Sequence, residues 1–265
     1  MAYEFHPGPV TAGYRLAKGI VRRAKRAVTG CDMNVVYEPE FGFAYVPVPK
    51  VACSTVKEAL FRATRSGEFD AIVHRDIPRV HFYYHIHQRY HLSETQLSTL
   101  DMFRFTVIRD PVKRLISAYT NRVQDKRDLE RQVTDLSVLS AKCLPLRPDI
   151  ETFALNLTTY AAANASLKHH LRSQAEILRD PDLYDRIYQI EELDLLASDF
   201  EAQTGRALNL RRANPSVAAK PTLGPSAQRA VRQFYADDYA MFPQLLKSAR
   251  QHPVASASAG LKTAS

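Results

Sequence analysis

The sequence contains few cysteines and no long apolar run. Its 265 residues include three cysteines, Cys31, Cys53 and Cys143, and neither their odd number nor their spacing suits a disulfide framework or a structural zinc site. No run of about 18 apolar residues is present, and the first residues lack the charged and apolar regions of a secretory signal. We therefore expect a soluble protein in the reducing environment of the cytoplasm.

Negative charge is the scarcer sign. The chain has 36 Lys and Arg residues against 28 Asp and Glu residues, which gives a formal net charge of +8 at pH 7. A basic balance suits anionic partners such as nucleotides, acidic glycans, nucleic acid or an anionic membrane surface, but it does not choose among them. The hydrophobic content of 45% is that of a globular protein with a substantial core.

Residues 14–29 follow the pattern of a basic amphipathic helix. Apolar residues recur at i, i+4 spacing from Leu16 to Val28, with Lys and Arg between them. Such a helix could lie on an anionic membrane surface, or it could be a solvated helix packed on the domain. The chain is expected to have three parts: a basic segment of residues 1–35, a single domain of residues 36–250, and a disordered tail of residues 251–265.

Hydrophobic patterns predict strands that alternate with helices. Residues 41–48, 103–108 and 184–190 are rich in aromatic and β-branched side chains and predict three strands. Asp110 is a good N-cap and Pro111 suits the first helical position, so a helix is expected to begin there. This alternation is typical of an α/β fold in which a parallel sheet is flanked by helices.

Lys50 stands in a turn between a predicted strand and a predicted helix. A turn of this kind presents free backbone N–H groups at the positive end of the helix dipole. Lys50 adds a positive charge, and two hydroxyl groups follow it. These are the elements of a phosphate-binding loop, and its candidate residues are Lys50, Val51, Ala52, Cys53, Ser54 and Thr55.

The loop lacks the glycines of a nucleoside-triphosphatase loop. That pattern is G-x-x-x-x-G-K-[ST], whereas three residues separate Lys50 from Ser54, and no glycine occurs between Gly42 and Gly67. A strand that ends in a magnesium-ligating Asp is not recognisable either. Metal-triphosphate chemistry is therefore disfavoured and no metal is expected. The alternative that stays open is another P-loop-like nucleotide-dependent transferase, such as a small-molecule kinase.

A second motif joins an arginine to a serine. Arg109 ends the strand predicted over residues 103–108, and Ser117 lies about two turns into the following helix. Arg binds phosphate as a planar, bidentate fork, and a Ser that faces back toward the strand end would complete a phosphate pair. The alternative is that Arg109 only pairs with Asp110 or another neighbour.

Together the two motifs resemble the 5′-phosphosulfate loop and the 3′-phosphate motif of sulfotransferases that use 3′-phosphoadenosine 5′-phosphosulfate (PAPS). The resemblance is to the carbohydrate branch, which includes chondroitin, dermatan and heparan sulfate 2-O-sulfotransferases. It extends over about residues 42–243, with weaker similarity at residues 170–174, 190–193 and 235–242. It implies that Lys50, the N–H groups of residues 51–55, Ser54 and Thr55 hold the 5′-phosphosulfate, and that Arg109 and Ser117 hold the 3′-phosphate.

Histidines gather before the arginine motif. Four of the nine in the chain are His81, His85, His87 and His91. His85 and His87 share one face of an extended segment, and this pair resembles one in heparan sulfate 2-O-sulfotransferases. The resemblance implies that His87 takes the proton of the acceptor hydroxyl and that His85 assists. The alternatives are histidines without chemistry and a zinc site, for which no Cys or acidic ligand stands at familiar spacing.

The resemblance implies an enzyme that moves a sulfuryl group from PAPS to a carbohydrate or glycoconjugate hydroxyl. The expected acceptor is an anionic or neutral glycan or glycolipid, and nucleic acid is not expected as a partner. Without the membrane anchor of animal relatives, the chain suits a bacterial cytoplasmic enzyme, peripheral at the inner membrane through residues 14–29. The third class to consider is a binding protein whose basic helix attaches to nucleic acid or membrane.

Overall fold

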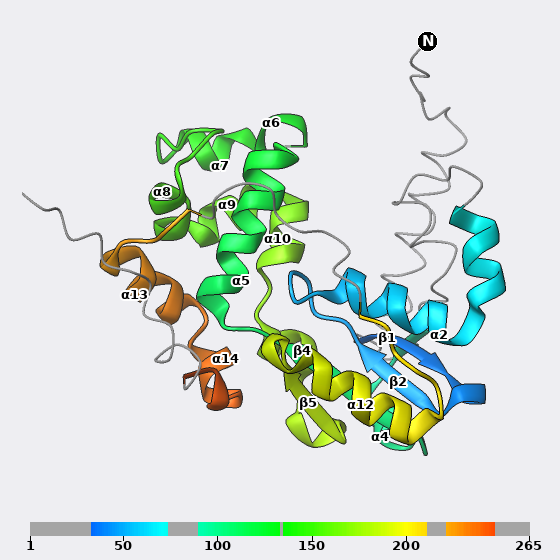
Figure 1. Ribbon diagram of the computed structural model, residues 1–265. Coiled ribbons are helices and arrows are strands. Elements are labelled where there is room, and N and C mark those ends of the chain that lie inside the picture. Colours follow the sequence, from blue (N-terminus) through cyan, green and yellow to red (C-terminus); the bar gives the residue numbers. More distant parts are fainter. Residues whose placement is uncertain (1–32, 74–89, 133–134, 211–220, 247–265) are drawn as a thin grey trace, which may run out of the picture.

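The centre of the molecule is a five-stranded sheet (Figure 1). The computed structural model describes residues 33–73, 90–132, 135–210 and 221–246, so the predicted basic helix over residues 14–29 and the tail from residue 251 lie outside the described residues. Along the sheet the strands lie in the order β3-β1-β2-β4-β5. Their bounds are β1 (Met33–Glu38), β2 (Phe43–Val46), β3 (Tyr90–Leu92), β4 (Phe103–Ile108) and β5 (Arg186–Gln189).

The sheet is mixed. Its parallel part consists of β2, β4 and β5, the three strands predicted from the sequence, with Phe43 opposite Phe103 and Phe105 opposite Arg186. The strands β1 and β3 were not predicted; β1 pairs antiparallel with both β2 and β3. Parallel neighbours need crossover connections, which the helices supply. The α/β class is therefore confirmed, and an antiparallel edge is added to the expected parallel sheet.

Helices make up most of the described residues outside the strands, and no described helix is both long and apolar enough to cross a bilayer. Those before β5 are α2 (Cys53–Val73), α4 (Glu94–Ser98), α5 (Pro111–Ala118), the π-helical segment η2 (Tyr119–Asp125), α6 (Asp128–Arg131), α7 (Leu136–Ser140), α8 (Ile150–Leu155), α9 (Leu157–Ala163), α10 (Ala165–Leu171) and α11 (Gln174–Leu178). Those after β5 are α12 (Leu193–Thr204), α13 (Pro225–Phe234) and α14 (Ala236–Met241). Short 3₁₀ turns are η1 (Pro39–Phe41), η3 (Pro181–Leu183) and η4 (Ile190–Glu192).

Buried apolar side chains form two clusters. The first lies around the sheet, where the Phe200 ring of α12 packs on Phe43 and Phe105 with centroid distances of 5.2 and 6.3 Å. The second joins α5, η2, α8, α9, α10 and α13, and includes Leu115 and Phe153. Figure 1 shows most of these helices grouped beyond one end of the sheet. Each fully buried side chain of this kind stabilises the fold by about 1.5–3 kcal/mol.

Candidate functional site

The loop between β2 and α2 turns without glycine. Lys50 and Ala52 adopt the left-handed conformation, with φ of 65° and 48°, which costs a residue with a Cβ roughly 1–2 kcal/mol. Helix α2 begins at Cys53, and the N–H of Val56 donates to the carbonyl of Ala52 at 3.0 Å. The first N–H groups of a helix have no carbonyl partner within that helix, and those of α2 lie at this loop. These groups are therefore free to meet an anion.

Lys50 is a largely buried cation. Its Nζ donates to Oδ1 of Asn121 at 2.8 Å. The pKa of Lys50 is lowered from 10.5 to about 8, mainly by burial and in part by Arg122 and Arg109, whereas Cys53 and Asp125 oppose the shift. The ammonium group of Lys50 is partly removed from water and has no full counter-charge. An anionic ligand would supply that counter-charge and stabilise the charged form of Lys50.

Arg109 connects the second predicted motif to the first. It follows the last residue of β4, and its Nη1 donates to the carbonyl of Lys50 at 3.2 Å. Gln174 of α11 holds its backbone on both sides: the Arg109 N–H donates to Oε1 at 2.9 Å, and Nε2 donates to the Arg109 carbonyl at 2.8 Å. The position of this guanidinium is therefore set by the strand, the loop and α11 together.

Asp110 begins α5 in the predicted manner. Its Oδ1 accepts from the N–H of Lys113 at 2.9 Å, and Pro111 occupies the first helical position. Its Oδ2 accepts from the hydroxyl of Tyr239 at 3.0 Å. The carboxylate of Asp110 thus serves as a helix cap and ties α14 to α5.

One cavity of about 510 Å³ takes in both predicted motifs. It lies between β1, the loop after β2, the helical segments α5 and η2, and α10. No Asp or Glu of the described residues lines it, whereas five Lys and Arg residues do. The cavity is therefore electropositive. Its lining includes Lys50, Ala52, Cys53, Ser54, Thr55, Lys57, Arg109, Ser117, Asn121, Arg122, His169, His170 and Arg172.

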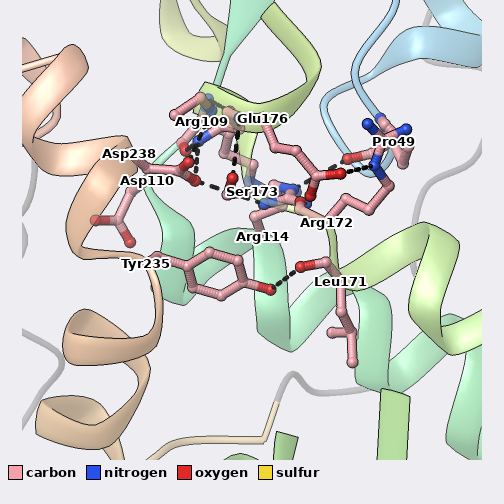
Figure 2. A network of polar contacts seen from close by, with 12 residues as sticks. Pro49, Arg109, Asp110, Arg114, Leu171, Arg172, Ser173, Glu176, Tyr235 and Asp238 are labelled. Carbon is pink, nitrogen blue, oxygen red and sulfur yellow. Dashed lines mark hydrogen bonds and ion pairs between the residues drawn. The ribbon is translucent and has the colours of Figure 1, made fainter. Parts of the chain in front are cut away.

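The buried guanidinium of Arg114 supports this cavity from behind (Figure 2). It is 1% exposed. Its Nε donates to the carbonyl of Pro49 at 3.2 Å, and its Nη2 donates to the carbonyls of His170, at 3.3 Å, and Arg172. One side chain therefore joins the loop that precedes Lys50 to the connection between α10 and α11, two walls of the cavity.

The fully buried carboxylate of Asp238 is the counter-charge of Arg114 (Figure 2). Its Oδ2 lies 3.7 Å from Nη1 of Arg114 and accepts from Nε2 of Gln174 at 3.2 Å. Its Oδ1 accepts from the N–H of Ala175 at 2.9 Å. Because a buried charge is tolerated only when it is paired and hydrogen-bonded, this network fixes α14 against the site.

His170 lines the cavity as a neutral imidazole. Burial lowers its pKa to about 3, and Arg122, His169, Lys50 and Arg114 add to the effect. Its Nδ1 is buried and has no hydrogen-bond partner in the described part of the molecule. His170 and Gln174 stand four residues apart, but they lie in different environments: His170 lines the cavity, and Gln174 belongs to the buried network.

The structure brings together the residues of the two predicted motifs, the loop of Lys50 and the Arg109–Ser117 pair. Lys50, Ser54, Thr55, Arg109 and Ser117 line one cavity, together with Ala52 and Cys53, whereas Val51 is fully buried and offers only its backbone. His85 and His87 lie outside the described residues, so their role stays a prediction.

The sequence analysis missed several residues of the cavity, among them Asn121 and Arg122, and it missed Arg114, which supports the cavity. Asn121 follows Ser117 by four residues, so a shared helix face could have indicated it. The local sequence predicts that Arg114 is exposed to solvent, and nothing in it indicates that the side chain is buried.

A larger cavity of about 660 Å³ lies at the opposite end of the parallel strands. It is lined by the first residues of β4 and β5, Phe103 and Arg186, and by three carboxylates, Asp101, Asp185 and Asp199. Ligands of α/β sheets bind at the carboxyl ends of strands, and an acidic lining repels phosphate. We therefore place the functional site in the cationic cavity.

Comparison with known proteins gives one match. Residues 33–243 match the model of the Sulfotransferase family, whose members use PAPS as the sulfuryl donor. No curated protein and no solved structure shows significant similarity to the chain. The matched region includes the loop of Lys50, the Arg109 motif and Asp238. The chain therefore belongs to the Sulfotransferase family.

Proposed function

We propose that this sulfotransferase transfers the sulfuryl group of PAPS to a hydroxyl of a carbohydrate or glycoconjugate by in-line displacement. One observation carries the assignment of the site: a glycine-free phosphate-type loop and the Arg109–Ser117 pair line the same cationic cavity. PAPS carries anionic groups on both its 5′ and 3′ positions, which two separate anion-binding elements suit. The volume of about 510 Å³ falls in the range of small-molecule sites.

The residues divide by the end of the nucleotide that they would hold. Lys50, the N–H groups of residues 51–55 and the hydroxyls of Ser54 and Thr55 would bind the 5′-phosphosulfate at the N-terminus of α2. Arg109 and Ser117 would bind the 3′-phosphate, because a guanidinium fork and a hydroxyl together donate to several phosphate oxygens. Both elements stand on rigid strand and helix ends, which favours a fixed orientation of the donor.

To catalyse this transfer, the protein has to stabilise negative charge on the leaving group and remove a proton from the acceptor hydroxyl. When bound, PAPS supplies an activated sulfuryl group. Lys50 stabilises the negative charge that develops on the oxygen bridging sulfur and the leaving phosphate. His87, assisted by His85, takes the proton of the acceptor hydroxyl. The cations of the cavity lining, with no carboxylate among them, favour a glycan or glycolipid that carries negative charge over a cationic acceptor.

Transfer of radiolabelled sulfate tests the proposal. The full chain is incubated with sulfur-labelled PAPS and a panel of acidic glycans, neutral glycans and glycolipids, with Lys50→Ala as the blank. We expect label on a saccharide in the wild type alone. His87→Ala should abolish transfer and still bind 3′-phosphoadenosine 5′-phosphate. Label on no saccharide, with transfer to another class of hydroxyl, would overturn the choice of acceptor.

A thermal-shift assay separates this proposal from the kinase alternative. The folded state is stabilised by any ligand that binds it in preference to the unfolded state. We expect 3′-phosphoadenosine 5′-phosphate to raise the melting temperature without metal, and ATP with Mg²⁺ to raise it less. The reverse order would favour a triphosphate-dependent transferase.

A further inference from the structure

The π-helical segment η2 continues α5 into the cavity without a break. It covers Tyr119–Asp125, and its wider turn is visible in the bond from the N–H of Lys126 to the carbonyl of Asn121 at 3.1 Å, five residues back. Segments of this kind are less stable than α-helix and occur mostly at functional sites. Here the wider turn lets two successive residues, Asn121 and Arg122, line the cavity beside Ser117.

Asn121 makes the side-chain contact that fixes Lys50. The Nζ–Oδ1 distance is 2.8 Å, and the two residues are 71 positions apart in the chain. An ammonium group has three donors, so one bond to Asn121 leaves two for an anion. The contact therefore orients the Lys50 side chain and leaves two of its N–H groups available to bind PAPS.

A neutral acceptor is the chemically suitable partner at this position. A carboxylate would neutralise Lys50 and compete with the phosphosulfate for its ammonium group. An amide oxygen accepts the same hydrogen bond and leaves the positive charge available. The cavity lining agrees with this requirement, since no Asp or Glu of the described residues takes part in it.

Arg122, the second residue that η2 delivers, is itself firmly held. Its Nε donates to Oδ2 of Asp128 at 2.7 Å, and its Nη2 donates to the hydroxyl of Ser166 at 2.6 Å. These bonds anchor η2 to α6 and α10. Asn121 therefore lies on a segment that is held in place by its neighbours, and a positioning residue requires such support.

We propose that Asn121 is a positioning residue that orients the ammonium group of Lys50 toward the sulfuryl-bearing phosphate. The proposal rests on the catalytic role proposed for Lys50 and adds to it the residue that sets its direction. It also gives the π-helical segment a function, because η2 brings Asn121 to the cavity.

The charged and titratable groups around Lys50 influence what a change at Asn121 would do to the pKa of Lys50. They are Arg109 after β4, Arg122 and Asp125 of η2, Cys53 at the start of α2, and His170 of α10. Loss of the amide oxygen removes a bond to the charged form of Lys50, so its pKa should fall below about 8. An aspartate at the same position should raise it.

Kinetics of Asn121→Ala and Asn121→Asp test the positioning role. We expect Asn121→Ala to lower kcat about a hundredfold, since small misplacements of a catalytic group have effects of this size. The Kd for 3′-phosphoadenosine 5′-phosphate should change by less than about threefold, because Arg109, Ser117 and the loop N–H groups remain. Asn121→Asp keeps an acceptor for Lys50 and should retain more kcat than Asn121→Ala, but its carboxylate competes for the ammonium group and should raise the KM for PAPS. The alkaline limb of its pH profile should move to higher pH. Asn209→Ala, an exposed asparagine, is the matched control.

A second measurement does not depend on turnover. NMR of the labelled lysine side chain in the donor-free protein should show the pKa of Lys50 lowered in Asn121→Ala and raised in Asn121→Asp. Unchanged kcat in Asn121→Ala, or an unmoved Lys50 titration in both variants, would overturn the proposal. Absence of sulfuryl transfer by the wild type would instead refute the proposed function, and in that case the NMR titration still decides whether Asn121 holds Lys50.

Discussion

Replacing Lys50 by methionine should abolish sulfuryl transfer and stabilise the ligand-free fold. Burial lowers the pKa of Lys50 from 10.5 to about 8, so its charged form is disfavoured in the folded chain. At about 1.4 kcal/mol for each factor of ten, this disadvantage is about 3 kcal/mol at pH 7. Methionine has no charge to desolvate but loses the hydrogen bond to Asn121, which offsets about 1 kcal/mol. We expect a net gain of about 2 kcal/mol in the free energy of unfolding.

The expected gain in the free energy of unfolding of Lys50→Met depends on pH. Between pH 8 and pH 10.5 the unfolded chain binds a proton at Lys50 that the folded chain has lost, so wild-type stability rises with pH over this window. The advantage of Lys50→Met should therefore shrink as pH rises and disappear by about pH 10.5. Other titrating groups affect both proteins equally and cancel in the difference.

Urea unfolding of both proteins at pH 7, 9 and 10.5 measures this difference. Lys168→Met, which replaces an exposed lysine of α10, is the matched control and should show no pH-dependent gain. A Lys50→Met variant that is less stable than wild type at pH 7, or a difference that stays constant with pH, would refute the reasoning from burial.

Three further predictions concern the donor site and its support. Ser117→Ala should weaken binding of 3′-phosphoadenosine 5′-phosphate about tenfold in calorimetry, because a hydrogen bond to a charged phosphate is lost, and should leave adenosine 5′-phosphosulfate binding unchanged. The wild-type Kd for the bisphosphate should rise about tenfold from pH 7 to pH 9 as Lys50 loses its proton, and Lys50→Arg should remove this dependence. In urea unfolding, Arg114→Met should cost about 3–5 kcal/mol because Asp238 stays buried and unpaired, and adding Asp238→Leu should recover part of the loss.

Each of these has a contradicting outcome. Equal losses for both nucleotides in Ser117→Ala would separate Ser117 from the 3′-phosphate. A bisphosphate affinity that is flat with pH in the wild type would mean that Lys50 keeps its proton to higher pH than burial implies. A double variant at Arg114 and Asp238 no more stable than Arg114→Met would show that the two residues act independently.

The strands that the sequence predicted are those with continuous apolar and aromatic runs. Residues 103–108 form β4 with the expected bounds, and four successive residues at its end are buried. The antiparallel strands lack such a signal. β1 alternates buried and half-buried residues only at its start and ends in Tyr37 and Glu38, and β3 is three residues long. Their pairing is set by tertiary contacts rather than by local pattern.

The apolar spacing of residues 226–247 is that of a single helix, but the structure divides the described part of this segment into two helices. Tyr235, with φ of −107° and ψ of 31°, ends α13, and α14 follows. The Tyr235 hydroxyl donates to the carbonyl of Leu171 at 2.9 Å, and its ring lies under the Arg114 guanidinium at 5.2 Å. A buried aromatic residue is compatible with a helical stripe, so periodicity alone could not indicate the break.

The two phosphate-binding motifs lie close together because of the sheet topology. Lys50 comes after β2 and Arg109 after β4, and the carboxyl ends of parallel neighbours meet at one edge of the sheet. That relation was predictable once both strands were identified. The contribution of Asn121 could have been indicated by its spacing of four residues from Ser117. The contribution of Arg122 could not, because a π-helical register depends on packing, and the bonds of Arg122 to Asp128 and Ser166 have no sequence signature.

The buried pair of Arg114 and Asp238 has a consequence for synthesis on the ribosome. Asp238 is made about 120 residues after Arg114, which at about 5–20 residues per second corresponds to a delay of roughly 6–25 s. During that interval Arg114 has no counter-charge, and the wall that it forms behind Pro49 is incomplete. We therefore expect the nascent domain to bind nucleotide only after α14 has left the ribosome.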